Sequence, residues 1–423
     1  MKAKSSEEVL IVYLNENRIG TLHRHKAGKL EFAYDPDYRG IPLSYSMPLI
    51  ERIHGHDTIT PFLWNLLPDD TRHLATWGKQ FQIDSSNCFG LLREIGEDCA
   101  GAIRFVSPEK DKETQHGGFT PITEKEIGRR LALLENDPSA ARSLTDQGRF
   151  SLAGAQPKIA LRQHNENWYI PWGKEPTTHI LKPPRSNFPG LAENEHFCLK
   201  LASSLGLRAA ESTVQTFDGN KTFLVKRFDR MKRKEGLYRI HQEDMCQALG
   251  IGPERKYEND NGPGIPDIMG ILSSSSRRLE DRESFMDAIV FNYLILGTDA
   301  HAKNYSILHT RQGFILAPLY DIASFAPYIQ IQKDERLAMR IDRYYKIAQI
   351  RKRHFERTAK SCNFSSKRLL QQLENFASQM PRICEDVGHS TINEGLDSQF
   401  IESLVKSLTE RSKQALDLLT EKQ

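Results

Sequence analysis

Alternating apolar and polar positions predict that the first hundred residues form short β-strands. The expected strands lie at residues 8–14, 18–25, 29–34 and 100–106. Between the third and fourth strands, the apolar spacing becomes helical over residues 60–81. There Phe62, Leu63, Leu66 and Leu67 share one side and Pro68 interrupts the pattern. The segment 107–123 is charged, bears glycines and has few large apolar groups, so we expect a surface linker.

After this segment the pattern alternates between helices and strands. Thr123, with Glu126 three residues later, predicts the N-cap of an amphipathic helix reaching residue 137. A second helix is expected at 193–207, ended by Gly206. Strands are predicted at residues 157–163, 168–172, 178–182, 212–217 and 222–228. From residue 240 onward the pattern is mostly helical, apart from one hairpin.

A β-rich first half and a helical second half predict an α+β fold of two lobes with a cleft between them, meeting at residues 226–230. We expect four parts along the chain: a β-rich N-terminal subdomain, a linker, a β-rich lobe and a helical lobe, at residues 1–108, 109–123, 124–229 and 230–423.

Composition narrows the classes of partner. The 423 residues carry 58 basic and 55 acidic side chains, a net charge of +3, which produces no strong field toward nucleic acid or an anionic membrane. The six cysteines are scattered without C-x-x-C spacing, which favours reduced thiols in a cytoplasmic protein. Neither a signal peptide nor a membrane-spanning stretch is indicated, so we expect no membrane association.

Three short segments carry candidate phosphate and base contacts. Small residues at Ser151, Ala153, Gly154 and Ala155 precede a strand with Lys158, as in loops whose backbone N–H groups approach phosphates, although a plain tight turn fits equally. Lys182 closes a strand and can reach phosphates, with Glu195 on the next helix as its ion-pair partner. The alternative for Lys182 is a solubilising charge at a strand end.

The third segment, Lys226 to Asp229, lies where the two halves meet. In a two-lobed nucleotide enzyme this connection borders the adenine and offers it backbone groups and an aromatic face such as Phe228. Alternatively, Phe228 belongs to the core.

The densest polar stretch, LGTDAHAKNYSIL, follows an apolar helix. Asp299 and Asn304 have the D-x-x-x-x-N spacing of a protein-kinase catalytic loop, in which the Asp accepts the acceptor proton and the Asn binds a metal. The strands YSIL and FILA then form a hairpin that returns the chain to its starting point. Asp321 is thereby expected beside Asn304, and their oxygens suit Mg²⁺.

A second class of enzyme uses similar residues. Asp299-Ala300-His301 is a D-x-H, with which metallophosphoesterases begin, but the G-D and G-N-H blocks that should follow are missing. A catalytically inactive binding module is a third possibility. The role of His241 to Asp244 stays open, with a helix N-cap as one interpretation.

The chain resembles the HipA-like serine/threonine kinases, toxins of bacterial toxin–antitoxin modules. The matching segments occur in the family's order: FSLAGAQPK, THILK, NEHFCLKLA, FLVKRFDR, RIHQEDMCQALG, GTDAHAKN and PLYDIAS. FLWNLLPD and LLREIGEDCAGAI resemble the family's extra N-terminal subdomain. The resemblance implies a two-lobed protein-kinase-like fold and an ATP- and Mg²⁺-dependent protein kinase.

The resemblance also implies roles for residues. Asp299 would be the catalytic base, Asn304 and Asp321 would hold Mg²⁺, and Ser151 would be autophosphorylated, which ejects its loop and switches the enzyme off. The ATP contacts would come from Ser151, Ala153, Gly154, Ala155, Gln156, Lys158, Lys182, Lys226, Phe228 and His301. Lys226 departs from the family pattern, since the best-known member is acidic there.

Partners are implied in the same way. The family phosphorylates aminoacyl-tRNA synthetases and is bound by a dimeric helix-turn-helix antitoxin, HipB-like, that carries it to operator DNA. The near-neutral charge agrees with DNA contact made mainly through the antitoxin.

Overall fold

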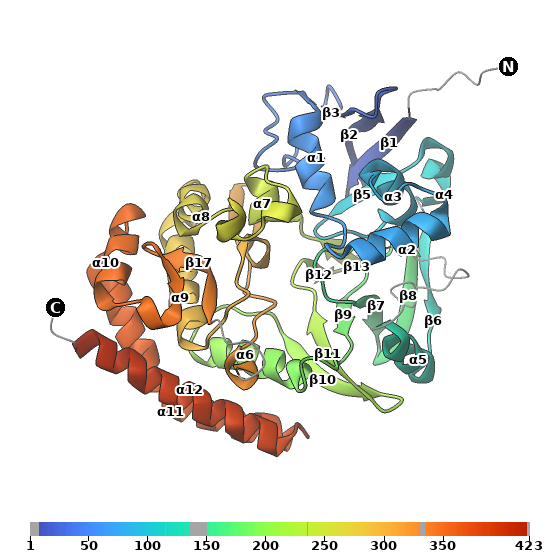
Figure 1. Cartoon of the computed structure of the whole chain (residues 1–423). Coiled ribbons are helices and arrows are strands. Elements are labelled where there is room, and N and C mark those ends of the chain that lie inside the picture. The colour runs from blue at the N-terminus through green and yellow to red at the C-terminus, as the bar shows by residue number, and fades with distance from the viewer. Residues whose placement is uncertain (1–7, 115, 135–149, 235, 330–334, 421–423) are drawn as a thin grey trace.

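The computed structural model describes residues 8–114, 116–134, 150–234, 236–329 and 335–420. Two β-rich parts, blue to green in Figure 1, lie beside a helical part coloured yellow to red. The predicted α+β class and its two lobes are therefore confirmed.

The N-terminal domain is built on a five-stranded antiparallel sheet with the order β4-β3-β2-β1-β5. Its strands are β1 (Glu8–Leu14), β2 (Asn17–Arg24), β3 (Leu30–Tyr34), β4 (Ile53–His54) and β5 (Ile103–Val106). The expected helical stretch is divided around Pro68 into α1 (His56–Trp64) and α2 (Thr71–Phe81), followed by α3 (Cys88–Ile95). Leu10, Phe32 and Phe62 are fully buried in the core that joins this sheet to its helices.

The second β-rich part contains a six-stranded sheet with the order β10-β11-β9-β7-β8-β6. Its strands are β6 (Gly117–Pro121), β7 (Ile159–His164), β8 (Asn167–Gly173), β9 (His179–Lys182), β10 (Ser212–Phe217) and β11 (Asn220–Lys226). Two helices, α5 (Glu124–Leu134) and α6 (Leu191–Ser204), accompany them. Neighbouring side chains of β11 point to opposite faces: Leu224 packs in the cluster that contains α5, and Phe223 in the cluster that contains α6.

The expected linker is more ordered than the sequence pattern indicates. Residues 108–114 form η1 (Pro108–Lys110) and α4 (Asp111–Thr114). Gly117 to Pro121 form the edge strand β6, paired antiparallel with β8 from Gly173 to Tyr169. The expected surface linker therefore contains a short helix and an edge strand that the sequence pattern did not predict. The sequence prediction relied on the lack of large apolar groups in this segment. Backbone hydrogen bonds to β8 nevertheless hold residues 117–121 as a strand.

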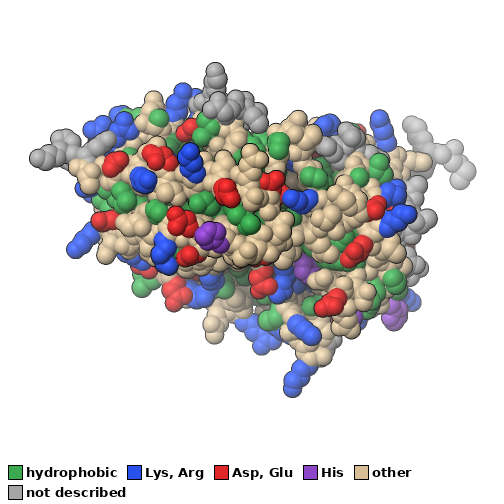
Figure 2. All heavy atoms as spheres, turned by 90° about the horizontal axis from the view of Figure 1, so that it is seen from below, with side chains coloured by type: hydrophobic (Ala, Val, Ile, Leu, Met, Phe, Trp, Pro, Cys, Tyr) green, Lys and Arg blue, Asp and Glu red, His purple; other side chains and the backbone are tan. Residues whose placement is uncertain are grey.

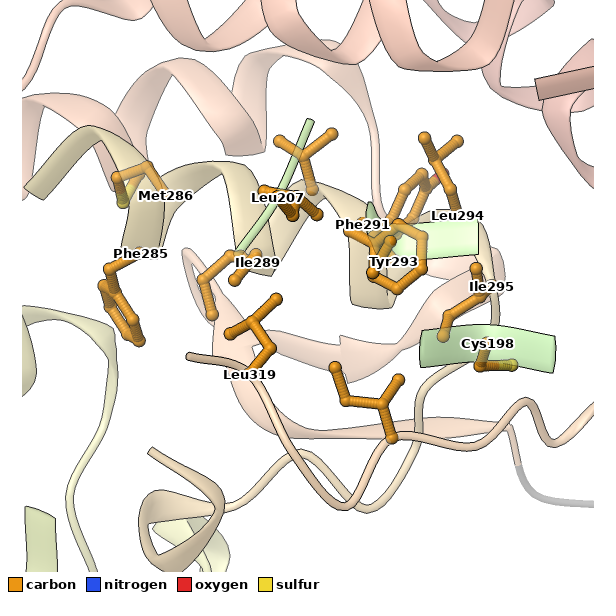
Figure 3. Packing of buried hydrophobic residues seen from close by; sticks show 14 of the residues in the cluster. Cys198, Leu207, Phe285, Met286, Ile289, Phe291, Tyr293, Leu294, Ile295 and Leu319 are labelled. Atoms are coloured by element: carbon orange, nitrogen blue, oxygen red, sulfur yellow. The ribbon is translucent and has the colours of Figure 1, made fainter. Parts of the chain in front are cut away.

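The helical part is organised around α9 (Arg278–Leu294), which is apolar on nearly every side in its second half. Figure 3 shows Phe285, Ile289, Phe291 and Tyr293 of this helix among the apolar side chains of one buried cluster, with Ile289 beside Leu319. The other helices are α7 (Met245–Ala248), α8 (Ile265–Leu272), α10 (Lys352–Ser361), α11 (Ser366–Asn393) and α12 (Ser398–Thr420), with η3 (Pro253–Arg255), η4 (Glu258–Asp260), η5 (Ala302–Asn304), η6 (Ala326–Tyr328) and η7 (Ile347–Gln349). The two longest, α11 and α12, lie side by side at the bottom of Figure 1.

Small sheets interrupt this helical part. The predicted hairpin is present as β15 (Ser306–Thr310) and β16 (Gly313–Leu316), joined by β14 (Gln242–Asp244). Two pairs were not predicted: β12 (Arg230–Arg233) with β13 (Gly236–Arg239), and β17 (Arg336–Ile341) with β18 (Tyr344–Lys346).

The surface agrees with the near-zero net charge. On the face shown in Figure 2, basic and acidic side chains are interspersed rather than separated into large areas of one sign. Within the described ranges, none of the helices combines the length and apolar character that crossing a bilayer requires.

Candidate functional site

A cavity of about 640 Å³ lies where the β-rich and helical parts meet. Its walls come from the small-residue loop, the end of β9, the segment after β11, the polar loop after α9 and the segment after β16. Twelve of the thirteen residues predicted for the site line this cavity: Ala153, Gly154, Ala155, Gln156, Lys158, Lys182, Lys226, Phe228, Asp299, His301, Asn304 and Asp321. The thirteenth, Ser151, is buried in the same small-residue loop.

The small-residue loop is held against the N-terminal domain. Ser151 is fully buried, and its Oγ donates to the carbonyl oxygen of Leu66 at 2.7 Å. The backbone N–H of Ser151 donates to the carbonyl of Asp98 at 3.0 Å. Gly154 has a φ of +103°, and a Cβ there would approach Lys158 Nζ to 2.7 Å, so the turn favours glycine.

Lys158 lies under this loop. Its Nζ donates to the carbonyl of Ala153 at 2.6 Å. Burial, reinforced by the positive charge of Lys182, lowers the pKa of Lys158 to about 8. An anionic ligand in the cavity would favour the charged form, so this lysine is suited to binding phosphate oxygens.

Lys182 closes β9 and joins two carboxylates. Its Nζ lies 2.6 Å from Glu195 Oε1, as the sequence predicted, and 2.5 Å from Asp321 Oδ1. Burial alone would lower the pKa of Lys182, but the two carboxylates outweigh it and raise that pKa. For Asp321, likewise, burial would raise the pKa and Lys182 holds it below the usual range. The strand-end lysine is thus a buried charge of the site, not a solubilising one.

The segment after β11 borders the cavity as predicted. Phe228 is half-buried, and its ring centre lies 5.3 Å from that of Tyr320. Lys226 is exposed and its Nζ lies 2.8 Å from Glu211 Oε2, so an acidic group neutralises the unusual basic residue.

The polar loop after α9 contains Asp299, which is exposed to the cavity. Its Oδ1 accepts a hydrogen bond from the hydroxyl of Tyr257 at 2.6 Å. Asn304 Nδ2 donates to the carbonyl of Asp299 at 2.8 Å and approaches the carbonyl of Asp321 at 3.5 Å. The hairpin therefore brings Asn304 and Asp321 together, as their sequence positions predicted.

His301 lies between these residues and is buried. Its backbone N–H donates to the carbonyl of Asp299 at 2.8 Å, and its ring meets Tyr257 edge-on at 4.9 Å. Burial lowers its pKa, which favours the neutral imidazole, and its Nδ1 has no hydrogen-bond partner among the residues that the structure describes.

The donor set fits a magnesium ion held together with nucleotide phosphates. Asp321 and Asn304 provide carboxylate and amide oxygens, and Mg²⁺ is commonly bound by one or two such groups, substrate phosphates and water. Within the described residues, no group of three or more His, Cys, Asp or Glu side chains is placed to hold a metal.

The residues from His241 to Asp244 have separate structural tasks. Asp244 caps α7 in a capping box with Gln247, which confirms the N-cap interpretation. His241 Nε2 is hydrogen-bonded to the carbonyl of Leu43 at 2.8 Å, and Glu243 Oε1 accepts from the N–H of Tyr45 at 2.7 Å. This strand thus joins the helical part to the N-terminal domain.

A buried ionic network makes the same connection beside Phe228. Asp98 of the N-terminal domain pairs with Arg230 at 2.8 Å and Arg239 at 3.1 Å, and Asp229 pairs with Arg227 at 2.8 Å. All five are less than 10% exposed. Sequence reasoning missed Asp98; the signal was the acidic pair Glu97-Asp98 in GEDCAGA, whose other residues are small or apolar.

Two other residues at the site were also missed. Tyr257 touches the Asp299 carboxylate, and Asp69 of the N-terminal domain lines the cavity. Neither has a local sequence signal, because each meets its partners only through the fold.

Comparison with known proteins identifies relatives along most of the chain. A family model described as the HipA-like C-terminal domain matches residues 150–384, and one described as the HipA N-terminal domain matches residues 10–106. A putative kinase, Y4mE, of Sinorhizobium fredii is 33% identical over 94% of this chain and 96% of its own. The serine/threonine-protein kinase toxin HipA of Shewanella oneidensis is 31% identical over 74% of this chain and 73% of its own.

A solved structure gives the same result. The Shewanella oneidensis MR-1 complex of HipA, HipB and operator DNA contains a chain that superimposes with a TM-score of 0.83 at 26% identity, covering 97% of this chain and 98% of that one.

Proposed function

This chain belongs to the HipA family of serine/threonine kinases, and we propose that it transfers the γ-phosphoryl group of ATP to a serine or threonine hydroxyl of a protein. One observation carries this proposal. Lys182, Asp321, Asn304 and Asp299 line one cavity, and a lysine, two possible metal ligands and a carboxylate base are the groups that protein kinases use for phosphoryl transfer.

In this mechanism Asp299 accepts the proton of the acceptor hydroxyl. The hydrogen bond from the Tyr257 hydroxyl occupies Oδ1 of Asp299 and orients its carboxylate. The other oxygen, Oδ2, is therefore the one that takes the proton of the substrate hydroxyl. Lys158 and Lys182 bind phosphate oxygens, and the loop from Ser151 to Gln156 covers them.

Asn304 and Asp321 would hold Mg²⁺, which when bound neutralises charge on the nucleotide phosphates. The adenine is expected against Phe228, beside the backbone of Lys226. His301, neutral and with Nδ1 unpartnered, is available to donate or accept a hydrogen bond at the nucleotide.

We propose the biological setting from the relatives. A toxin role follows from the Shewanella HipA, and a HipB-like antitoxin that contacts operator DNA follows from the composition of the solved complex. An aminoacyl-tRNA synthetase is the proposed substrate. The six free, buried cysteines support a cytoplasmic location, where thiols stay reduced. We keep the division into residues 1–108, 124–229 and 230–423 as proposed domains, with the intervening segment partly built into the second sheet.

The test is transfer of label from γ-labelled ATP to proteins of a bacterial lysate, with and without EDTA. We expect labelled proteins only with magnesium present, and mass spectrometry of the labelled bands identifies the target. Metal-dependent release of phosphate without an ATP requirement would instead support a phosphoesterase. Absence of both ATP binding and phosphate incorporation would support an inactive binding module.

We predict that Ser151 is the site of autophosphorylation. Its hydroxyl is buried against the Leu66 carbonyl, where roughly −1.5 to −2 of added charge has no room, so phosphorylation requires the loop to leave the N-terminal domain. Intact-mass measurement after incubation with Mg-ATP should show one phosphate fewer for Ser151→Ala than for wild type. The exposed Ser86→Ala is the matched control. An unchanged phosphate count in Ser151→Ala would place the modification elsewhere.

We predict that ATP affinity falls as the pH rises from 7 to 9. The pKa of Lys158 is about 8 in the free protein, so above this pH a proton must be taken up before the lysine can pair with phosphate. Calorimetric titration should show a loss of up to roughly tenfold in ATP affinity between pH 7 and pH 9. Lys158→Arg keeps its charge and should flatten the profile. An equally steep profile in that variant would show that another group titrates.

A further inference from the structure

Asp69 of the N-terminal domain forms ion pairs with two lysines of the helical part. Its Oδ1 lies 2.5 Å from Lys303 Nζ, and its Oδ2 lies 2.8 Å from Lys256 Nζ. The three side chains are only 11%, 4% and 15% exposed, in the order Asp69, Lys303, Lys256. Because these side chains are largely buried, water and salt screen their charges only weakly. The two ion pairs therefore hold Asp69, Lys303 and Lys256 in defined positions.

The position of Asp69 is fixed from its own side. The two leucines before it, Leu66 and Leu67, are buried in the core of the N-terminal domain. Its backbone N–H donates to the carbonyl of Gly154 at 3.3 Å, and Pro68 forms a parallel bridge with the same glycine. The carboxylate therefore extends from a rigid support directly beside the small-residue loop.

Both lysines adjoin the proposed catalytic base. Lys303 stands between His301 and Asn304 in the loop that begins at Asp299. Lys256 immediately precedes Tyr257, whose hydroxyl binds Asp299 Oδ1. One carboxylate thus contacts the two segments that determine where the Asp299 side chain lies.

The two segments also need this carboxylate electrostatically. The backbones of the two segments are joined by a hydrogen bond from the N–H of Ala302 to the carbonyl of Lys256 at 3.3 Å. This contact brings the ammonium groups of Lys256 and Lys303 close together in a largely buried position. Like charges in such a place repel one another unless an anion lies between them. Burial alone would raise the pKa of Asp69, yet the two lysines lower it, which keeps the carboxylate ionised.

We propose that Asp69 is a positioning residue for phosphoryl transfer, through which the N-terminal domain holds Lys303 and the Lys256–Tyr257 segment and thereby sets the geometry at Asp299. The inference rests on the proposed function, because it assigns Asp299 as the base. It gives the N-terminal domain a part in the reaction, through the segments that hold Asp299.

The test compares Asp69→Asn with wild type in the full-length chain. The measured quantities are the maximal rate of label transfer from γ-labelled ATP to the chain and lysate proteins, and the ATP concentration for half that rate. We expect the maximal rate to fall roughly 10- to 100-fold, the size of effect that a displacement of about 1 Å produces. The half-saturating ATP concentration should stay within about twofold, because no phosphate contact is removed.

The matched control is Asp70→Asn, the same substitution at the next residue. Asp70 caps α2 by accepting from the N–H of Arg72 at 2.8 Å, and asparagine caps equally well, so this variant should match wild type. A double variant, Asp69→Asn with Lys303→Met, should lose no more activity than the more impaired single variant if Asp69 acts through Lys303. The double variant removes one negative and one positive charge, so it leaves no additional unpaired charge at this position. It can therefore replace Asp69→Asn in the test if that single variant does not fold.

Three results would overturn the inference: a wild-type maximal rate in Asp69→Asn or in the double variant, a change confined to the half-saturating ATP concentration, or fully multiplicative losses in the double variant. If wild type itself transfers no phosphate, the proposed function fails. If wild type and Asp69→Asn transfer equally, only the role of Asp69 fails.

Discussion

Replacing Asp299 with Asn should lower the rate of phosphoryl transfer about 10²- to 10⁴-fold while leaving ATP binding nearly unchanged. Asparagine cannot accept the proton of the acceptor hydroxyl at neutral pH. It can still accept the Tyr257 hydrogen bond through Oδ1, and the hydrogen bond that Asn304 donates to residue 299 goes to its backbone carbonyl, which the substitution does not change. The loop should therefore keep its shape, and the loss should be confined to the chemical step.

The measurement is single-turnover transfer from γ-labelled ATP at saturating nucleotide, together with calorimetric ATP affinity. Asp218→Asn is a matched control, since Asp218 is exposed on a turn with a φ of +46°, which asparagine tolerates well. Transfer by Asp299→Asn at the wild-type rate would remove Asp299 from the role of base. A large loss of ATP affinity would assign it to nucleotide binding instead.

Replacing Asp98 with Asn should destabilise the chain by about 3–5 kcal/mol, because it leaves buried arginines without their counter-charge. Asp98 accepts hydrogen bonds from Arg230, from Arg239 and from Thr177 Oγ1 at 2.8, 3.1 and 2.6 Å. Asparagine retains the shape but not the charge, and Asp229 alone must then neutralise the cluster. Urea unfolding at pH 7 measures the effect. Exposed Asp37→Asn should stay within about 0.5 kcal/mol of wild type.

The same carboxylate predicts a pH dependence. Burial would raise the pKa of Asp98, but Arg230, Arg239 and Arg227 hold it well below its usual range. The contribution of ionised Asp98 to the free energy of unfolding is therefore fully present above the unfolded-state pKa of about 3.9. This contribution is lost as the pH falls through the lower pKa that Asp98 has in the folded protein. Wild type should lose stability on acidification below about pH 5, and Asp98→Asn should lose less. Equal losses in both proteins would contradict this assignment.

The parts of the site that could be predicted from sequence are those built by local geometry. A helix end followed by one hairpin brings Asp321 to Asn304, and a strand end followed by one helix brings Glu195 to Lys182. Each step uses an element whose spacing is visible in the sequence, and the resemblance to a kinase family then supplied roles for these residues.

The parts that could not be predicted depend on how separate domains dock. Asp69 and Asp98 meet lysines and arginines more than a hundred positions away, and nothing near either residue indicates such a partner. The strand β6 was missed for a related reason, since GGFTP has little intrinsic strand character and is held by its pairing with β8. Long-range hydrogen bonds and charges, not local preference, decide these features.

The long separation between Asp98 and its arginines also has a consequence during synthesis. Arg227 is 129 positions after Asp98, which at about 5–20 residues per second is roughly 6–26 s of translation. Through that interval the N-terminal domain has left the ribosome with this carboxylate still in water and without its counter-ions. The kinase cleft is assembled only after Arg227, Arg230 and Arg239 arrive and the catalytic loop follows them. A fragment that ends before Asp299 lacks the proposed catalytic base, so the proposed phosphoryl transfer becomes possible only after about 70% of the 423 residues have been made.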